Sequence, residues 1–177
     1  PEEPIFVVNG DTKNIKVTYP EDLILANKVL SNCSEDVTVE VSRFELEGKV
    51  SEIHAFFHVK PNSGENFDAM AEKIDKAKKE FKESLGDAKI VFERYFLSDI
   101  ANQHEAVEKL HDGVAATSRI KQEPLDGSKI ALLVYFQTGT SIERNGKTTE
   151  TSHNGYTHFW TTNLQEKDGD RSIQTPQ

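Results

Sequence analysis

The stretch AKIVFERYFLSDIANQ, residues 88–103, decides the fold of this chain. Its first ten residues read as a buried strand, because a strand covered on both faces is a nearly continuous apolar run. The strand carries one arginine, Arg94, and ends in a polar turn. A buried guanidinium needs a partner or a route to solvent. Arg94 therefore either binds an anionic ligand or pairs with an acid such as Asp99 or Glu123.

Amphipathic helices precede and follow this strand along the chain. Apolar residues recur with the helical period over residues 67–85, and a run of charged residues occupies the opposite face of that segment. Asn66 or Ser63 can cap the start of this helix, and Gly86 suits its end. A shorter helix is predicted over residues 99–111.

Four more strands surround these helices in the sequence. Alternating apolar residues predict a hairpin of two strands over residues 37–46 and 53–59. The phase of the alternation changes around Ser42-Arg43, which predicts a β-bulge there. Two further strands follow the second helix, over residues 114–123 and 129–137. The last of these is the most apolar segment of the chain, so we expect it to be a central strand.

The order strand, strand, helix, strand, helix, strand, strand predicts an α+β fold with a mixed β-sheet and both helices on one face. The other face of the sheet then needs cover. Phe56, Val91 and Tyr95 indicate that this other face is not polar. We expect subunit association to cover it.

The chain is expected to hold one domain with two extensions. Residues 36–137 form the domain, and residues 1–35 form an N-terminal extension. Residues 138–177 add a hairpin around Asn145-Gly146, a strand over residues 157–162 and a loose tail.

Composition excludes some classes of function. The 21 basic and 30 acidic residues give a net charge of −9 and a pI near 5.2, which disfavours binding to nucleic acid or to anionic membranes. No apolar run approaches the roughly 18 residues that span a bilayer. The single cysteine, Cys33, reads as an ordinary small residue. The chain begins at Pro1 without a targeting segment, which favours the cytoplasm, although removal of an upstream signal peptide would leave the same sequence.

Two pairs of histidines are candidate metal ligands. His54 and His58 share one strand face, but without a third ligand they read as solvent-facing. His153 and His158 fall on opposite faces of one strand, so shared ligation would require the turn at Gly155 to bring them together. We predict no metal site and no cofactor.

Over residues 36–137, more than half of the chain, the sequence resembles the RidA/YjgF family. The resemblance rests on the long helix at 67–85, on AKIVFERYFLSDIANQHEAVEKL and on SRIKQEPLDGSKIALLVYF. Members of this family have the chorismate-mutase-like fold and assemble as trimers. The chain looks closest to the RidA-like halves of the chorismatase branch. In that branch an Arg-Tyr-Phe-Leu-Ser-Asp-like strand end precedes an Asn-Gln pair and a Gln-x-Pro-Leu-x-Gly-like turn.

The resemblance implies that a homotrimer binds a small carboxylated metabolite in clefts between its subunits. The implied chemistry is imine-deaminase or chorismatase-like hydrolysis. Family deaminases clamp the substrate carboxylate with an arginine and place a glutamate beside the attacking water. The arginine position falls near Ala116, with Arg119 three residues later, and the glutamate position falls on Ala131, which cannot do acid–base work. The competing hypothesis is a non-catalytic assembly or ligand-sensing module of the same fold.

The candidate ligand-binding residues are expected near the cleft, and no catalytic residue is assigned. The arginines would bind the anionic group of the ligand. The amides would form hydrogen bonds with its polar groups, unless they make hydrogen bonds in the first turn of the helix instead. The tyrosine would supply a hydroxyl unless it packs in the core. The candidates are Arg94, Asn102, Gln103, Arg119, Gln122, Glu123 and Tyr135.

Overall fold

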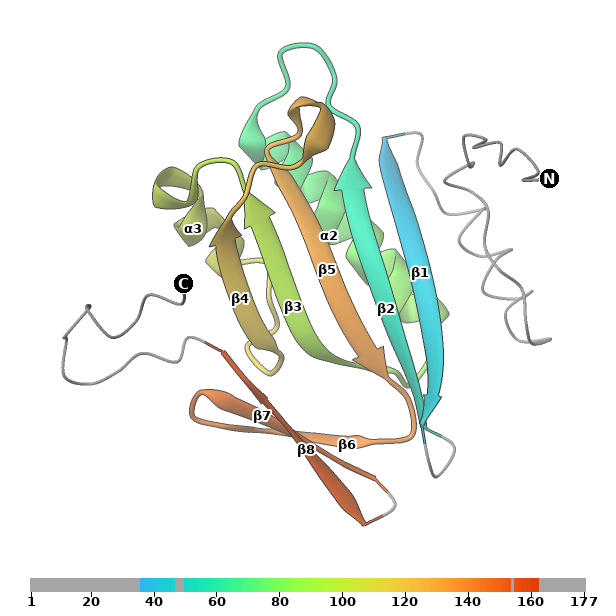
Figure 1. Ribbon diagram of the computed structural model, residues 1–177. Helices are drawn as coiled ribbons and strands as arrows, with labels where there is room; N and C mark the ends of the chain where they lie inside the picture. The colour runs from blue at the N-terminus through green and yellow to red at the C-terminus, as the bar shows by residue number, and fades with distance from the viewer. Residues whose placement is uncertain (1–35, 47–49, 154, 163–177) are drawn as a thin grey trace, which may run out of the picture.

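A computed structural model describes residues 36–46, 50–153 and 155–162 of the protein. Eight strands and two α-helices follow one another along this part of the chain, with one 3-10 turn (Figure 1). The elements are β1 (Val37–Leu46), β2 (Val50–Val59), α2 (Phe67–Ser84), β3 (Lys89–Leu97), α3 (Ile100–Glu108), β4 (Ala116–Lys121), η1 (Leu125–Gly127), β5 (Ile130–Gln137), β6 (Ser141–Asn145), β7 (Thr148–His153) and β8 (Tyr156–Thr161).

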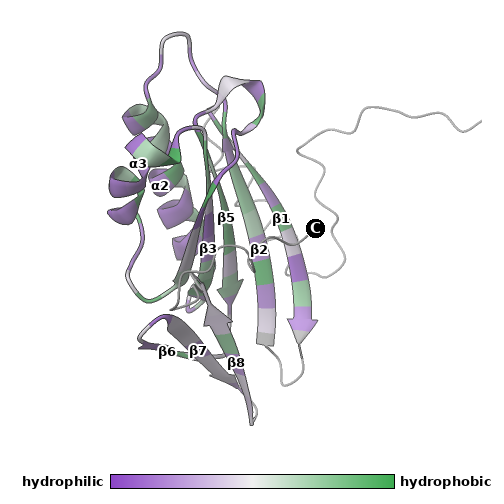
Figure 2. Cartoon of the chain, turned by 60° about the vertical axis from the view of Figure 1, so that its left-hand side comes forward, coloured by the Kyte–Doolittle hydropathy of each residue, from purple (hydrophilic) through white to green (hydrophobic). Residues whose placement is uncertain are grey.

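The first five strands form one mixed sheet in the order β1-β2-β5-β3-β4. Only β3 and β4 are parallel, because α3 crosses over between them, and the other neighbours are antiparallel. Strand β5 lies in the centre, as its apolar sequence predicted. Both helices cover the same face of the sheet (Figures 1 and 2). The prediction of an α+β fold with a mixed sheet is confirmed.

Helix α2 follows its predicted pattern closely. The side chain of Asn66 accepts a hydrogen bond from the backbone N–H of Ala69 at 3.0 Å, which caps the first turn. The apolar stripe of the helix is buried against the sheet. The helix ends at Ser84, with Leu85 as its C-cap and Gly86, which has a positive φ, directly after it.

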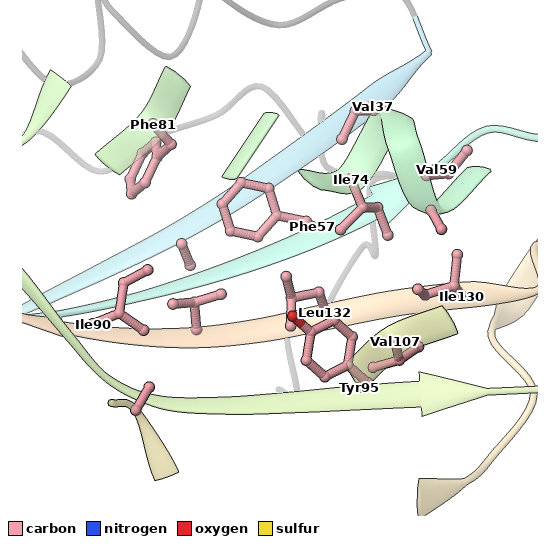
Figure 3. Close-up of a cluster of buried hydrophobic side chains, with 14 of the residues drawn as sticks. Val37, Phe57, Val59, Ile74, Phe81, Ile90, Tyr95, Val107, Ile130 and Leu132 are labelled. Carbon is pink, nitrogen blue, oxygen red and sulfur yellow. The ribbon is translucent and has the colours of Figure 1, made fainter. Parts of the chain in front are cut away.

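The core lies between this sheet face and the two helices. Alternate residues of β2, β3 and β5 are fully buried there, among them Phe57, Tyr95 and Leu132. Ile74 of α2 and Val107 of α3 pack onto them (Figure 3). Every second residue of these strands and the inward-facing residues of α2 and α3 therefore pack together in one apolar layer.

A buried ion pair crosses this layer. The Lys78 ammonium on α2 contacts Glu93 Oε1 at 2.9 Å, the backbone oxygen of Leu110 at 2.5 Å and the Tyr95 hydroxyl at 3.4 Å. Burial raises the pKa of Glu93, and Lys78 opposes that rise. The pKa of the Tyr95 hydroxyl is also raised by burial.

Two sequence-based details of the sheet are wrong. The register of β1 with β2 runs without interruption, so there is no bulge at Ser42-Arg43. The change of phase arises because Phe44 lies on the face away from the helices, against the ring of His54. The register shift lies instead in β3, between Ile90 and Phe92.

That shift also corrects the assignment of one side chain to a face. Tyr95 belongs to the core under the helices and not to the other face of the sheet. Val91 is the buried extra residue at the shift. Phe56 does lie on the face away from the helices, opposite Leu133 of β5.

The predicted hairpin around residues 145–146 and the strand after it form a second, antiparallel sheet in the order β6-β7-β8. This sheet lies at one end of the main sheet (Figure 1). Arg144 donates to the backbone oxygen of Ala115 at 3.1 Å, and the Thr149 hydroxyl donates to that of Val114 at 2.5 Å. The predicted N-terminal extension, Cys33 and the C-terminal tail lie outside the described residues.

Candidate functional site

The site is built on the face of the main sheet that the helices leave uncovered, here called the open face. Its side chains come from the positions that alternate with the core residues of β1, β2, β3 and β5. It carries aromatic, charged and histidine side chains. The residues used below are Glu40, Phe44, Glu52, His54, Phe56, His58, Phe92, Arg94, Phe96, Ala131, Leu133, Tyr135 and Gln137.

A cavity of about 450 Å³ occupies one end of this face. Phe56, Phe96 and Ala131 form an apolar part of its lining, on three neighbouring strands. The rings of Phe56 and Phe96 meet edge to face at 5.8 Å. This volume lies within the range of small-molecule sites, and these three residues give the cavity an apolar floor.

The loop between β4 and β5 forms one wall of the cavity. Gln122, Glu123 and Leu125 line it, and the side chains of all three are exposed. The ring of His58 contacts the backbone oxygen of Leu125 at 3.3 Å, which joins this loop to β2. The predicted positions of Gln122 and Glu123 therefore do face a cavity.

Charges of both signs surround the cavity. Glu40, Glu123 and Asp126 supply carboxylates, and Lys60 supplies an ammonium group. These polar side chains can orient a ligand that lies across the apolar floor.

Arg94 lies next to the cavity floor on the open face. It precedes Phe96 by two residues on the same strand, and it stands opposite Leu133, which stands opposite Phe56. Two residues along a strand are separated by about 7 Å. The guanidinium carbon lies 5.2 Å from the centre of the Phe92 ring.

The guanidinium of Arg94 has no carboxylate partner among the residues that the structure describes. Its Nε atom is buried and makes no hydrogen bond within that part of the chain. Asp99 instead receives a 2.5 Å hydrogen bond from Asn102, which lowers its pKa, and Glu123 is exposed. Of the two roles predicted for Arg94, the internal ion pair with Asp99 or Glu123 is not formed.

An aromatic and polar cluster fills the other end of the open face. The rings of His54 and Tyr135 are stacked, with their centres 3.6 Å apart. The Glu52 carboxylate contacts the His54 ring at 2.7 Å and accepts a hydrogen bond from the Gln137 amide at 2.8 Å. Trp160 of β8 reaches Tyr135 at 6.0 Å between ring centres. Tyr135 thus lies on the open face, packed among rings and not in the core.

Asn102 and Gln103 lie at the start of α3 and make local hydrogen bonds. The Gln103 side chain donates to the Ser98 hydroxyl at 3.0 Å and accepts from the backbone N–H of Asp99 at 3.0 Å. Asn102 is exposed and bonded to Asp99. The structure therefore places both amides in the first-turn arrangement that the sequence left open.

Arg119 lies on the opposite side of the sheet from Arg94. It shares a register position with Tyr95, which faces the helices, and its guanidinium pairs with Glu108 of α3. Hydrogen bonding to His111 and the charge of Arg119 lower the pKa of Glu108. Arg94 and Arg119 consequently cannot clamp one anion within a single subunit.

Sequence reasoning missed several residues of the cavity. Glu40, His58 and Lys60 line it from the β1–β2 hairpin. The alternation in β2 had placed His54 and His58 on one face, which was the available signal. The missing information was that the β4–β5 loop folds across that end of the face.

The two histidine pairs have different geometries. His54 and His58 are four residues apart on β2, a separation of about 13 Å, and therefore do not share an ion. His153 and His158 do meet across the turn at Gly155, with their Nε2 atoms 3.1 Å apart. No group of three or more histidine, cysteine or acidic side chains within the described ranges has the geometry to hold a metal ion.

Comparisons of the chain with family models, with curated proteins and with solved structures found no match. Within the described residues, neither helix is long and apolar enough to cross a membrane.

Proposed function

We propose that this chain is a RidA-like domain that binds a small carboxylated metabolite at the open face. The observation that carries the proposal is the partly buried guanidinium of Arg94, which has no ion-pair partner among the described residues and lies beside a cavity with an apolar part to its lining. A buried guanidinium nitrogen without a partner is costly, and a bidentate carboxylate satisfies it well.

The site is completed by a second and third copy of the chain in this proposal. The open face carries the half-buried aromatic residues Phe56, Phe92 and Phe96, and neither α2 nor α3 covers this face. Homotrimer formation would cover these rings and convert the cavity into a cleft between subunits.

The reaction proposed for this cleft is hydrolysis of the imine-deaminase or chorismatase type. A non-catalytic assembly or ligand-sensing module is the second candidate, and Ala131 favours it. This residue lies in the cavity lining, where the family resemblance would place a glutamate, and a methyl group cannot transfer a proton.

The test combines two probes with two arginine variants. The protein is incubated with chorismate and with 2-aminoacrylate generated in situ, and consumption above the buffer rate is measured. Binding of chorismate is measured by calorimetry, and the oligomeric state is measured by light scattering. Arg94→Ala should weaken binding by about 10- to 100-fold, because a hydrogen-bonded charge pair contributes about 1.5–3 kcal/mol.

Arg119→Ala is the matched control, because it removes an arginine from the other side of the same sheet. Binding should survive in this variant, and Arg94→Lys should lie between Arg94→Ala and the unaltered protein. Binding without turnover would favour the sensing module. Failure of the protein to bind or consume either probe would refute the ligand proposal.

A further inference from the structure

The second sheet holds a pair of histidines that the proposed site does not use. His153 ends β7, His158 lies on β8, and the turn at Gly155 joins the two strands. Their Nε2 atoms are 3.1 Å apart, and their ring centres are 4.9 Å apart. One ring therefore donates a hydrogen bond to the other, and the two ring nitrogens face each other between adjacent strands.

The separation of these nitrogens suits a shared metal ion. Zinc binds imidazole nitrogen at about 2.0–2.1 Å, so two tetrahedral ligand nitrogens are about 3.3 Å apart. With the same bond lengths, the observed separation corresponds to an angle of about 100° at the ion. A metal ion bound there would replace the proton of the hydrogen bond between the two rings.

The other four histidines have different neighbours. His54 contacts a carboxylate, His58 and His104 contact backbone oxygens, and His111 contacts Glu108. Only the pair on β7 and β8 brings two imidazoles together within the part of the chain that the structure describes.

One ring of the pair is buried, and the residues around the other ring are exposed. His153 is 9 % exposed, and its Nδ1 atom is buried without a hydrogen-bond partner among the described residues. His158 is half-buried, and Ser152, Tyr156 and Thr157 beside the pair are exposed. Coordination by water would require solvent to enter from the side of these exposed residues.

We propose that His153 and His158 form a two-histidine site for a divalent transition metal, with the remaining positions open to water or to an external ligand. Imidazole ligands suit Cu²⁺, Ni²⁺ and Zn²⁺, and affinity should be highest for Cu²⁺. Mg²⁺ and Ca²⁺ prefer oxygen ligands and should not bind here. The ion would join β7 to β8 and stabilise the second sheet.

The single tryptophan of the chain, Trp160, reports on this site. It lies two residues after His158 on β8, about 7 Å along the strand. Protein without a histidine tag is titrated at pH 7.5 with Cu²⁺ while Trp160 fluorescence is recorded. Calorimetry with Zn²⁺ gives the stoichiometry, and EDTA tests reversal. We expect one ion per chain and quenching that EDTA reverses.

Variants separate this site from adsorption elsewhere. His153→Gln and His158→Gln should each weaken Zn²⁺ binding by more than about 10-fold, the lower bound for loss of even an outer-shell partner. The control is the double variant His104→Gln/His111→Gln, which removes two histidines outside the site and should bind as the unaltered protein does.

Circular dichroism identifies any variant that does not fold, and His158→Gln is the informative one if His153→Gln unfolds the second sheet. In the unaltered protein, ¹H–¹⁵N spectra of the imidazole rings provide a readout that needs no variant. Zn²⁺ should shift the ring signals of His153 and His158 alone. Absence of one-to-one binding, equal binding by the folded His158→Gln variant, or shifts confined to other histidines would overturn the proposal.

Discussion

Glu93 and Arg94 are neighbours in β3, and they lie on opposite faces of the sheet. Glu93 points towards the helices, is 1 % exposed and is paired with Lys78. Arg94 points to the open face and has no ion-pair partner among the described residues. Within the described residues, the core face supplies a partner for its buried charge, and the open face supplies none for Arg94. The two faces of one strand therefore treat a charged side chain differently.

The same contrast holds for apolar side chains. Phe57 is fully buried under α2, and the preceding Phe56 is half-buried on the open face. Both belong to β2 and differ only in the direction of the side chain. Substitutions at such pairs measure separately what each face contributes.

The largest effect is expected at Phe57. Phe57→Ala should lower the free energy of unfolding by about 3–5 kcal/mol, because it leaves a cavity in a packed core. Phe56→Ala should lower it by about 1 kcal/mol in the monomer, because less area is lost from burial. Denaturant unfolding at low protein concentration measures both.

Protein concentration makes this comparison sharper. If copies of the chain cover the open face, the cost of Phe56→Ala should grow with protein concentration, while that of Phe57→Ala should not. If Phe56→Ala and Phe57→Ala destabilise the monomer equally, the two faces are equally packed, and Phe56 is not on a less buried face than Phe57.

The next largest effect is expected at the buried pair. Lys78→Met removes the partner of Glu93, which should cost about 3–5 kcal/mol near neutral pH. Burial raises the pKa of Glu93 above its ordinary value of 4.5, and loss of Lys78 should raise it further. The folded variant then binds a proton more tightly than the unfolded chain, so its stability falls as pH rises above about 4.5.

Thermal unfolding at pH 5 and pH 8 tests this dependence. Lys78→Met should be closer in stability to the unaltered protein at pH 5 than at pH 8. The double variant Lys78→Met/Glu93→Leu, in which neither charge remains, should recover most of the loss. Lys79→Met is the matched control on the exposed side of α2 and should be nearly neutral. If the loss of stability in Lys78→Met does not depend on pH, the unpaired Glu93 carboxylate is not its cause.

Local periodicity was sufficient to predict the helices, the strands and the central position of β5. It failed where the outcome depended on contacts between distant segments. Phe44 broke the alternation of β1 because it packs on His54 from the next strand, and the pattern alone reads like a bulge. The actual register shift lies between Ile90 and Phe92, in a continuous apolar run. Such a run has no alternation of apolar and polar residues from which a shift could be recognised.

The candidate site shows the same limit. Gln122 and Glu123 were predicted near a cleft, and they line the cavity because their loop folds over β2. The partner of Arg119 could not be read from the sequence, because Glu108 approaches it only through the crossover of α3. The meeting of His153 and His158 depended on the turn between β7 and β8, whose geometry the sequence left undecided.

The smallest effects are expected at the two arginines, and they bear most directly on the difference between the faces. Arg119→Ala breaks a partly exposed ion pair with Glu108, which should cost about 0.2–1 kcal/mol. The pKa of Glu108 is lowered in the folded protein, so this contribution is present above the ordinary value of 4.5 and disappears as pH falls.

Arg94→Ala has no ion pair to break within the described residues. Its stability should therefore match that of the unaltered monomer to within about 0.5 kcal/mol, or exceed it, because a buried guanidinium nitrogen without a partner is removed. Chemical denaturation of both variants at pH 7.5 and pH 4 measures the difference. A loss of several kcal/mol in monomeric Arg94→Ala would mean that Arg94 has a structural partner within its own chain, and the open face would then be as self-sufficient as the core face.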